Sequence, residues 1–216
     1  NNDNVNSNGY HLGFVETGEW TKYSVKINSS GVYRVKIRHA SEQNGGKLYL
    51  SLNDQNISSV YTTNSTGSWF SFITSTIDDV ILDQGNHSLK LHFNDDIPLN
   101  ISSILFEKIG EISSAPFKSV NGKTGSDEKS IEVFVNQEIL ASSINGSLDK
   151  FSITINGQDK SINSITLDSS KPKTLFLNLS DNLLYTDEIK VSYSGDLIKS
   201  NNNKVLNSFT NLQVIN

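Results

Sequence analysis

The sequence predicts an all-β protein made of two β-sandwich domains in tandem. Two observations predict this fold: apolar and polar residues alternate in short runs throughout the 216 residues, and clusters of Gly, Asn, Ser and Asp separate the runs. Hardly any segment repeats apolar residues at helical spacing. A strand with one face in a core and the other in water alternates in this way, so each run is expected to belong to an antiparallel sandwich.

The runs in the first half of the chain are rich in aromatic residues. Polar breaks such as residues 44–46 and 64–67 separate them and contain residues typical of turns. This half therefore predicts a first sandwich. Its expected core positions are Tyr23, Val25, Ile27, Tyr33, Val35, Ile37, Leu48, Leu50, Leu52, Phe70, Phe72, Leu89, Leu91 and Phe93.

A second series of runs begins after residue 110 and is mostly aliphatic. It contains the dipeptide Asn156-Gly157, a strong hairpin signal. A stretch of Gly, Ser, Ala and Pro lies between the two series. We therefore expect a first domain over residues 1–110, a linker over 111–117 and a second domain over 118–216. Core positions expected in the second domain include Ile131, Val133, Val135, Phe151, Ile153, Ile155, Leu175, Leu177, Leu179, Ile189, Val191 and Tyr193.

Composition argues against several function classes. The absence of cysteine excludes disulfides, thiol nucleophiles and Cys-type metal sites. A net charge of −5 argues against a general nucleic-acid binder, which needs a basic surface. No apolar run approaches the roughly 18 residues of a membrane span. The absence of methionine is expected for a segment that starts inside a longer precursor or after a processing site.

Acidic residues and histidines form no catalytic or zinc-binding pattern. Neighbours such as Asp78-Asp79 are expected on opposite strand faces or in solvent, whereas a glycosidase needs two carboxylates on opposite sides of a sugar bond. His39 continues the apolar alternation of Val35 and Ile37, which favours a packed histidine over a ligand. No nucleophile elbow, phosphate loop or dinucleotide fingerprint is present.

Both tryptophans are expected outside the core. Trp20 has the parity of Lys22 and therefore points to the polar face of its strand. Trp69 has the opposite parity to Phe70 and Phe72, which we expect in the core. An aromatic ring outside the core can stack on the apolar face of a sugar, or it can cap one end of the sandwich and pack under a loop. Parity leaves both interpretations open.

Several motifs in residues 9–109 follow one another in a fixed order and spacing. They are GYHLGFVETGEWTKYSV (9–25), GVY (31–33), GGKL (45–48), LND (52–54), TGSW (66–69), GNHSLKL (85–91) and NISSILF (100–106). This pattern resembles that of family 6 carbohydrate-binding modules, and the resemblance covers about half of the chain.

The resemblance implies a non-catalytic, jelly-roll-like sandwich that binds polysaccharide. In that family two aromatic rings in the loops at one sandwich end clamp a sugar, and an asparagine binds its hydroxyl groups. The matching residues here are Phe14, Trp69 and Asn100. Some members also use the concave sheet face, where the matching ring is Trp20. Xylan, cellulose, β-glucan and agar-type galactan are all ligands within the family.

The chain departs from the family pattern in three places. Phe14 replaces the usual Tyr or Trp, and Ser102-Ser103 replace an Asp/Asn-Trp pair. The E-A-E strand with which family members begin is missing before Asn1. Its glutamates belong to a structural calcium site, so the resemblance allows a structural Ca²⁺ while the sequence assigns no metal ligands and no other cofactor.

Residues 112–216 resemble, more weakly, the Ig-like (SwmB-like) accessory modules of bacterial secreted and surface proteins. The matching stretches are 151–157 and 187–195. Such modules are mostly spacers, which implies that the second domain of this chain is Ig-like and binds no glycan.

Three functions stay open from the sequence. The favoured one is polysaccharide binding that targets a covalently linked glycoside hydrolase, secreted by a bacterium, to its substrate. The second is a cell-surface adhesin fragment that recognises glycans. The third is a small glycan-active enzyme, for which Glu16 and Glu19 are the only acids near the aromatic site. Fold resemblance does not choose the ligand.

Overall fold

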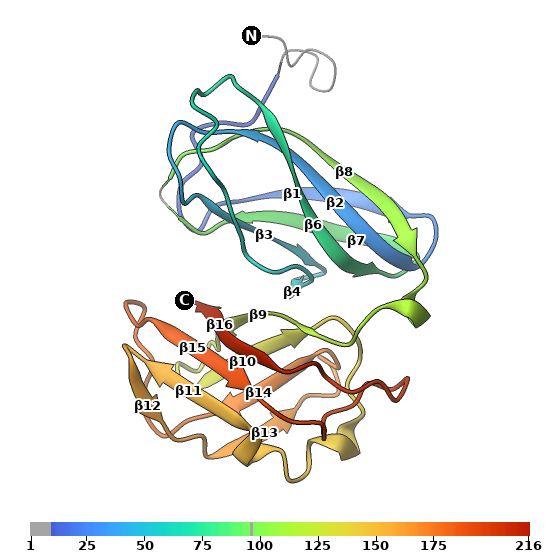
Figure 1. Cartoon of the computed structure of the whole chain (residues 1–216), viewed down its shortest axis with the longest axis vertical. Helices are drawn as coiled ribbons and strands as arrows, with labels where there is room; N and C mark the ends of the chain where they lie inside the picture. The colour runs from blue at the N-terminus through green and yellow to red at the C-terminus, as the bar shows by residue number, and fades with distance from the viewer. Residues whose placement is uncertain (1–9, 96) are drawn as a thin grey trace. The chain divides into compact units, whose positions relative to one another are not determined.

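The computed structural model describes residues 10–95 and 97–216 and divides into two compact units between Ala115 and Pro116 (Figure 1). We call them unit 1 (up to residue 115) and unit 2 (from residue 116). The prediction of an all-β chain is confirmed. Among the described residues the helices are short 3₁₀ turns, and none is long and apolar enough to cross a membrane. These turns are η1 (Ile112–Ser114), η2 (Ala141–Ile144) and η3 (Leu148–Lys150).

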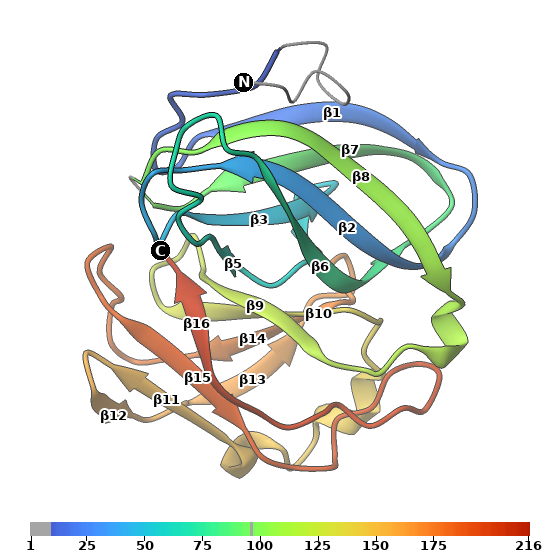
Figure 2. The same cartoon turned by 45° about the horizontal axis from the view of Figure 1, so that its top comes forward.

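Unit 1 is a sandwich of two sheets, seen as two layers in Figure 2. In one sheet the strand order is β1-β7-β3-β4, with β5 also paired to β3; in the other it is β6-β2-β8. All pairs are antiparallel. The strands are β1 (Trp20–Ile27), β2 (Gly31–Ala40), β3 (Lys47–Leu52), β4 (Gln55–Asn56), β5 (Tyr61–Thr62), β6 (Ile73–Leu82), β7 (Gly85–Phe93) and β8 (Asn100–Gly110).

The core of unit 1 lies between these sheets and follows the predicted alternation. Val35, Leu48 and Leu91 are fully buried, while their polar neighbours point away from the core. The prediction fails at Tyr23, which is 43% exposed in β1 and lies outside the core cluster, and at Phe70 and Phe72. Phe70 is 53% exposed, and Phe72 is only half-buried and lies outside the core cluster. Residues 67–72 form a turn and loop before β6, and side chains alternate between faces only in a strand.

Unit 2 is an eight-stranded arrangement with the order β12-β11-β15-β16-β9-β10-β14-β13. β16 joins its two halves, because its first part pairs with β15 while Val214 and Ile215 pair in parallel with β9. The Ig-like assignment of this half stays a prediction. The strands are β9 (Ser119–Thr124), β10 (Ser130–Val135), β11 (Phe151–Ile155), β12 (Gln158–Lys160), β13 (Ser164–Leu167), β14 (Thr174–Asn178), β15 (Ile189–Tyr193) and β16 (Phe209–Ile215).

Residues at the junction of the units are packed rather than free. Ala115 is buried with Val32 and Ile81 in a small cluster of unit 1. Phe117 is 1% exposed and belongs to the core of unit 2. The predicted linker 111–117 therefore contains residues that are packed into each of the two units.

Candidate functional site

A cleft of about 440 Å³ in unit 1 brings together residues that are far apart in the sequence. Phe14, Trp69 and Asn100, the three residues singled out from the sequence for the loop site, all line it. The remaining lining residues are His11, Phe70 and Pro98.

Strand register places these segments at one end of the sandwich. Across the β2–β8 pair Ala40 lies opposite Asn100, and across the β2–β6 pair His39 lies opposite Ile73. The loops that lead into β6 and β8 therefore meet at the end of β2. Trp69 belongs to the first loop, and Pro98 to the second.

Asn100 ties two walls of the cleft together. Its side chain is almost fully buried, and its Nδ2 donates a hydrogen bond to the backbone carbonyl of Trp69 at 2.7 Å. A Cβ atom on Gly13 would lie 2.6 Å from Oδ1 of Asn100, so only glycine lets the amide approach the chain this closely. The amide therefore fixes the position of the Trp69 backbone beside residues 11–14.

Phe14 projects from the unit on a constrained backbone. The residues around it are held: Leu12 exchanges two backbone hydrogen bonds with Ile101 (2.9 and 2.8 Å), and Val15 is buried in the core. The Phe14 ring is 98% exposed, and its φ angle of 57° lies in the left-handed region, which is unusual for a bulky residue. Such strained residues concentrate at binding sites, where surrounding structure holds them in place.

The Trp69 loop is held by a buried serine. Ser41 is fully buried and donates its backbone N–H to Oγ1 of Thr66 (3.0 Å), while the Thr66 N–H donates to the Ser41 carbonyl (2.8 Å). The Ser41 hydroxyl also donates to the carbonyl of Pro98 at 3.1 Å. One serine thus connects the Trp69 loop to the Pro98 loop, so the backbones of these two loops are held together before a ligand arrives.

Sequence reasoning missed His11 and Phe70 as members of the cleft. The exposed His11 ring meets Phe70 edge-on, with ring centroids 5.8 Å apart and planes at 77°, and also contacts Phe72 at 5.8 Å. Phe70 follows Trp69 directly, and consecutive residues in a turn can face one cavity although consecutive strand residues cannot. The signal that could have found them was their closeness in sequence to Phe14 and Trp69.

Trp20 lies on a different surface. Its ring is 50% exposed on the sheet face that points away from the core, as the alternation predicts. The Lys90 ammonium lies 4.6 Å from the ring centroid and forms an ion pair with Asp54, and the hydrogen bond from Lys90 lowers the pKa of the Asp54 carboxyl. Because the ring is outside the cleft, Trp20 cannot share one sugar unit with Trp69.

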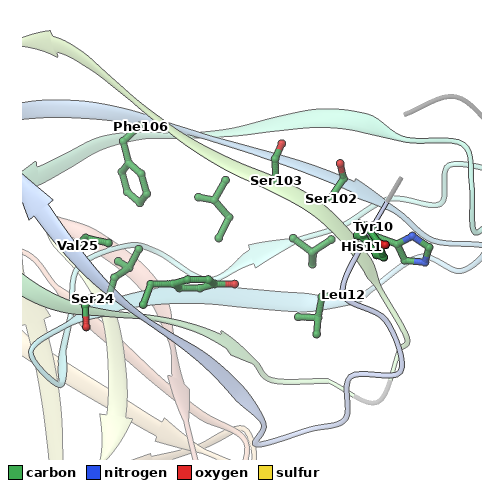
Figure 3. A pocket seen from close by; sticks show the side chains of 12 residues that line it. Tyr10, His11, Leu12, Ser24, Val25, Ser102, Ser103 and Phe106 are labelled. Carbon is green, nitrogen blue, oxygen red and sulfur yellow. The ribbon is translucent and has the colours of Figure 1, made fainter. Parts of the chain in front are cut away.

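A second cavity, a groove of about 660 Å³, lies between β1 and β8 (Figure 3). Phe106 and Val25 lie near one end, and Tyr10 and Leu12 lie near the other. Its lining is mainly apolar, with a few hydroxyl groups along β1 and β8. Apart from the Leu12–Ile101 bridge, the described residues give β1 only β7 as a partner and β8 only β2. The groove therefore runs between two strand edges.

Other titratable residues have structural roles. The backbone N–H of Glu16 donates to Oε2 of Glu19 at 2.9 Å, so Glu19 stabilises a turn, and neither carboxylate lines the cleft. His39 is fully buried beside Ser75, and burial lowers its pKa. This agrees with the expectation of a packed histidine.

The described part of the chain provides no ready metal site. Within residues 10–95 and 97–216, no three Asp, Glu or His side chains come together around a point that could hold an ion. Among the described residues, the lining of the cleft contains neither Asp nor Glu, the side chains that calcium prefers. The structural Ca²⁺ that the family resemblance allows therefore stays a prediction.

Unit 2 exposes one notable ring. Tyr185 is 75% exposed in the loop before β15, where Nδ2 of Asn216 donates to its carbonyl at 3.1 Å. No second aromatic ring in the described part of the chain contacts it. The absence of a glycan site from this half stays a prediction.

Comparison with known proteins supplies the family. Residues 1–108 match the model described as "Carbohydrate binding module (family 6)". No curated protein sequence gives a match. Among solved structures, the carbohydrate-binding module CBM6cm-2 of Cellvibrio mixtus lichenase 5A, in complex with cellotriose, is 27% identical, with 46% of this chain and 77% of that chain covered and a TM-score of 0.42.

Two further structures are similar over the same share of the chain. The C-terminal module of the laminarinase LamC from Zobellia galactanivorans is 25% identical, with 45% of this chain and 79% of that chain covered and a TM-score of 0.42. A family 6 module from Clostridium cellulolyticum, in complex with xylose, is 26% identical, with 45% and 78% covered and a TM-score of 0.41. Through its first 108 residues, which include every residue lining the cleft, the chain belongs to carbohydrate-binding module family 6.

Proposed function

We propose that unit 1 binds a polysaccharide chain in the cleft, with the rings of Phe14 and Trp69 stacked on the apolar faces of a sugar and Asn100 bound to its hydroxyl groups. The observation that carries the proposal is that three distant segments bring these side chains to one cleft. Family membership supports the same conclusion.

The chemistry of the cleft suits a neutral sugar. A pyranose ring presents C–H groups on its faces and hydroxyl groups at its rim, so it needs aromatic planes and a few polar groups. Within residues 10–95 and 97–216, the lining residues are aromatic or apolar except for His11 and Asn100, and none is Lys, Arg, Asp or Glu. The hydrogen bonds of Ser41 and Asn100 hold the backbone of the Trp69 and Pro98 loops in advance, which reduces the entropy lost on binding.

The direct test removes one ring. Trp69→Ala should weaken binding by about 1–3 kcal/mol, the scale of a large aromatic contact. Affinity gels with xylan, hydroxyethylcellulose, laminarin or agar would first identify the ligand, and titration calorimetry with a matching oligosaccharide would then measure the loss. Leu105→Ala is a matched control, because this exposed β8 residue lies outside the cleft. Equal affinity of Trp69→Ala and the wild type, with the fold intact, would contradict the proposal.

Trp20 is proposed as a second, independent contact on the outer face of its sheet. An exposed indole beside Lys90 and Asp54 offers a stacking plane with polar groups at its edge. Trp20→Ala should therefore weaken binding to long polysaccharides, which can reach both surfaces, more than binding to a trisaccharide held in the cleft.

The role of binding is proposed to be the targeting of a linked glycoside hydrolase outside a bacterial cell, with unit 2 as an Ig-like spacer. A cell-surface adhesin would use the same cleft and would differ only in what is linked to it. The sequence of the complete polypeptide decides between them: a catalytic domain supports targeting, and a cell-wall anchor supports adhesion.

Catalysis by unit 1 is not part of the proposal. Glycosidases hold two carboxyl groups about 5–10 Å apart around the scissile bond. None of the described residues that line the cleft carries a carboxylate, and Glu19 is engaged by the backbone of Glu16. Long incubation with the bound polysaccharide should therefore release no reducing sugar. Sugar release that Glu16→Gln or Glu19→Gln abolishes would reverse this conclusion.

A further inference from the structure

The described residues of the cleft offer few polar groups, and these groups are not equally free to bind a ligand. Asn100 is almost fully buried, and one of its N–H groups is already bound to the Trp69 carbonyl. Trp69 can donate only through its indole N–H. His11 is exposed, and within residues 10–95 and 97–216 its imidazole makes ring contacts but no hydrogen bond. A neutral imidazole offers one donor and one acceptor.

The position of His11 is fixed by its neighbours. Next to it in the chain, Leu12 is paired to Ile101 through two backbone hydrogen bonds. The imidazole lies edge-on to Phe70 and tilted against Phe72, with both ring centroids 5.8 Å away. A side chain held in this way loses little rotamer freedom when it binds a ligand. The ring is therefore prepared for a directed hydrogen bond, although it lies on the surface.

Resting on the proposed function of the cleft, we propose that His11 binds a sugar hydroxyl and is a selectivity residue of the site. Phe14 and Trp69 can stack on any sugar with flat apolar faces, so they distinguish sugars poorly. A polar group aimed at one hydroxyl discriminates strongly, because the sugar that lacks this hydroxyl leaves the polar group unpaired. Because of His11, the cleft is expected to prefer sugars that have one particular hydroxyl group in one particular orientation.

Two substitutions separate the ring of His11 from its polar atoms. His11→Phe keeps a planar ring against Phe70 and Phe72 but removes both nitrogens, whereas His11→Gln keeps a donor and an acceptor without the ring. Calorimetry would use the trisaccharide of the glycan that the affinity gels select. His11→Phe should bind about three- to tenfold more weakly than the wild type, and His11→Gln should recover most of the loss. Wild-type affinity of His11→Phe would overturn the inference.

Monodeoxy analogues of the same sugar identify the hydroxyl. For one analogue the wild type should lose affinity while His11→Phe loses none, because the partner of the missing hydroxyl is already gone. The inference is overturned if, for every analogue, the loss of affinity caused by His11→Phe and the loss caused by the missing hydroxyl are additive. The outcome is distinct from failure of the proposed function: if Trp69→Ala also has no effect, or if no glycan binds, the cleft is not a glycan site and the role of His11 falls with it.

Discussion

The backbone of Phe14 predicts a substitution that stabilises unit 1 and weakens its binding. A φ angle of 57° costs a bulky residue on the order of 1–2 kcal/mol, whereas Asn adopts this conformation readily. The ring is 98% exposed, so its removal gives up almost no packing. Phe14→Asn should therefore raise the free energy of unfolding by about 0.5–1.5 kcal/mol, equivalent to about 2–6 °C in Tm.

Phe14→Asn should lower the affinity for the glycan although it raises the stability. Losing one of the two platforms should cost about 1–3 kcal/mol of binding free energy, a fall in affinity of roughly five- to 150-fold. Both tryptophans lie in unit 1, so tryptophan fluorescence follows the unfolding of this unit within the full chain. Calorimetry with the oligosaccharide ligand gives the affinity.

Phe14→Tyr is the matched control, because it keeps both the ring and the backbone strain. Its stability should equal that of the wild type, and its binding should be retained. The reasoning is refuted if Phe14→Asn is less stable than the wild type, or if it binds the glycan equally well. The first result would mean that the φ angle carries no cost, and the second that the ring is no platform.

Three further predictions concern the packing of Gly13 against Asn100, the lack of glycan binding by unit 2, and the pH dependence of the stability of unit 2. Gly13→Ala should displace the Asn100 amide and weaken glycan binding without touching the ligand, by about 1–2 kcal/mol in calorimetry; unchanged affinity would show that the amide position is unimportant. Unit 2 (residues 116–216) expressed alone should fold, by circular dichroism, and migrate freely in every polysaccharide gel; retardation would reveal a site in unit 2. The pKa of Asp127 is lowered by hydrogen bonds from the backbone of Lys129 and from Ser130, so the stability it contributes is present above the ordinary carboxyl pKa of about 4 and is lost as pH falls below it. Asp127→Asn should flatten this part of the pH dependence of urea unfolding, and an unchanged pH profile would contradict the assignment.

Alternation predicted the strands and most of the core because burial on one face of a strand dictates a period of two residues. It placed Trp20 on the outer face for the same reason. It failed at Phe70 and Phe72, because a turn has no such period. It also failed at Tyr23, which lies in β1 but lines the groove beside β8 and stays 43% exposed.

The composition of the cleft could not be predicted from periodicity at all. Alternation assigns a side chain to a face but says nothing about which loops meet beyond the strand ends. Family motifs supplied Phe14, Trp69 and Asn100, because these positions are part of a shared pattern. His11 lies three residues before Phe14, but its place in the cleft became visible only with its contacts to Phe70.

The groove between β1 and β8 affects which strands of unit 1 separate first in local unfolding. Within residues 10–95 and 97–216, no strand connects β1 to β8 along this flank, and Tyr23 remains 43% exposed. Water already reaches these edges, so separating β1 or β8 from its sheet breaks fewer contacts than removing β2, which is paired on both sides. Backbone amides of β1 and β8 should thus exchange with deuterium earlier than those of β2. Partly opened molecules would expose strand edges to one another, which makes this flank the side from which aggregation of unit 1 should begin.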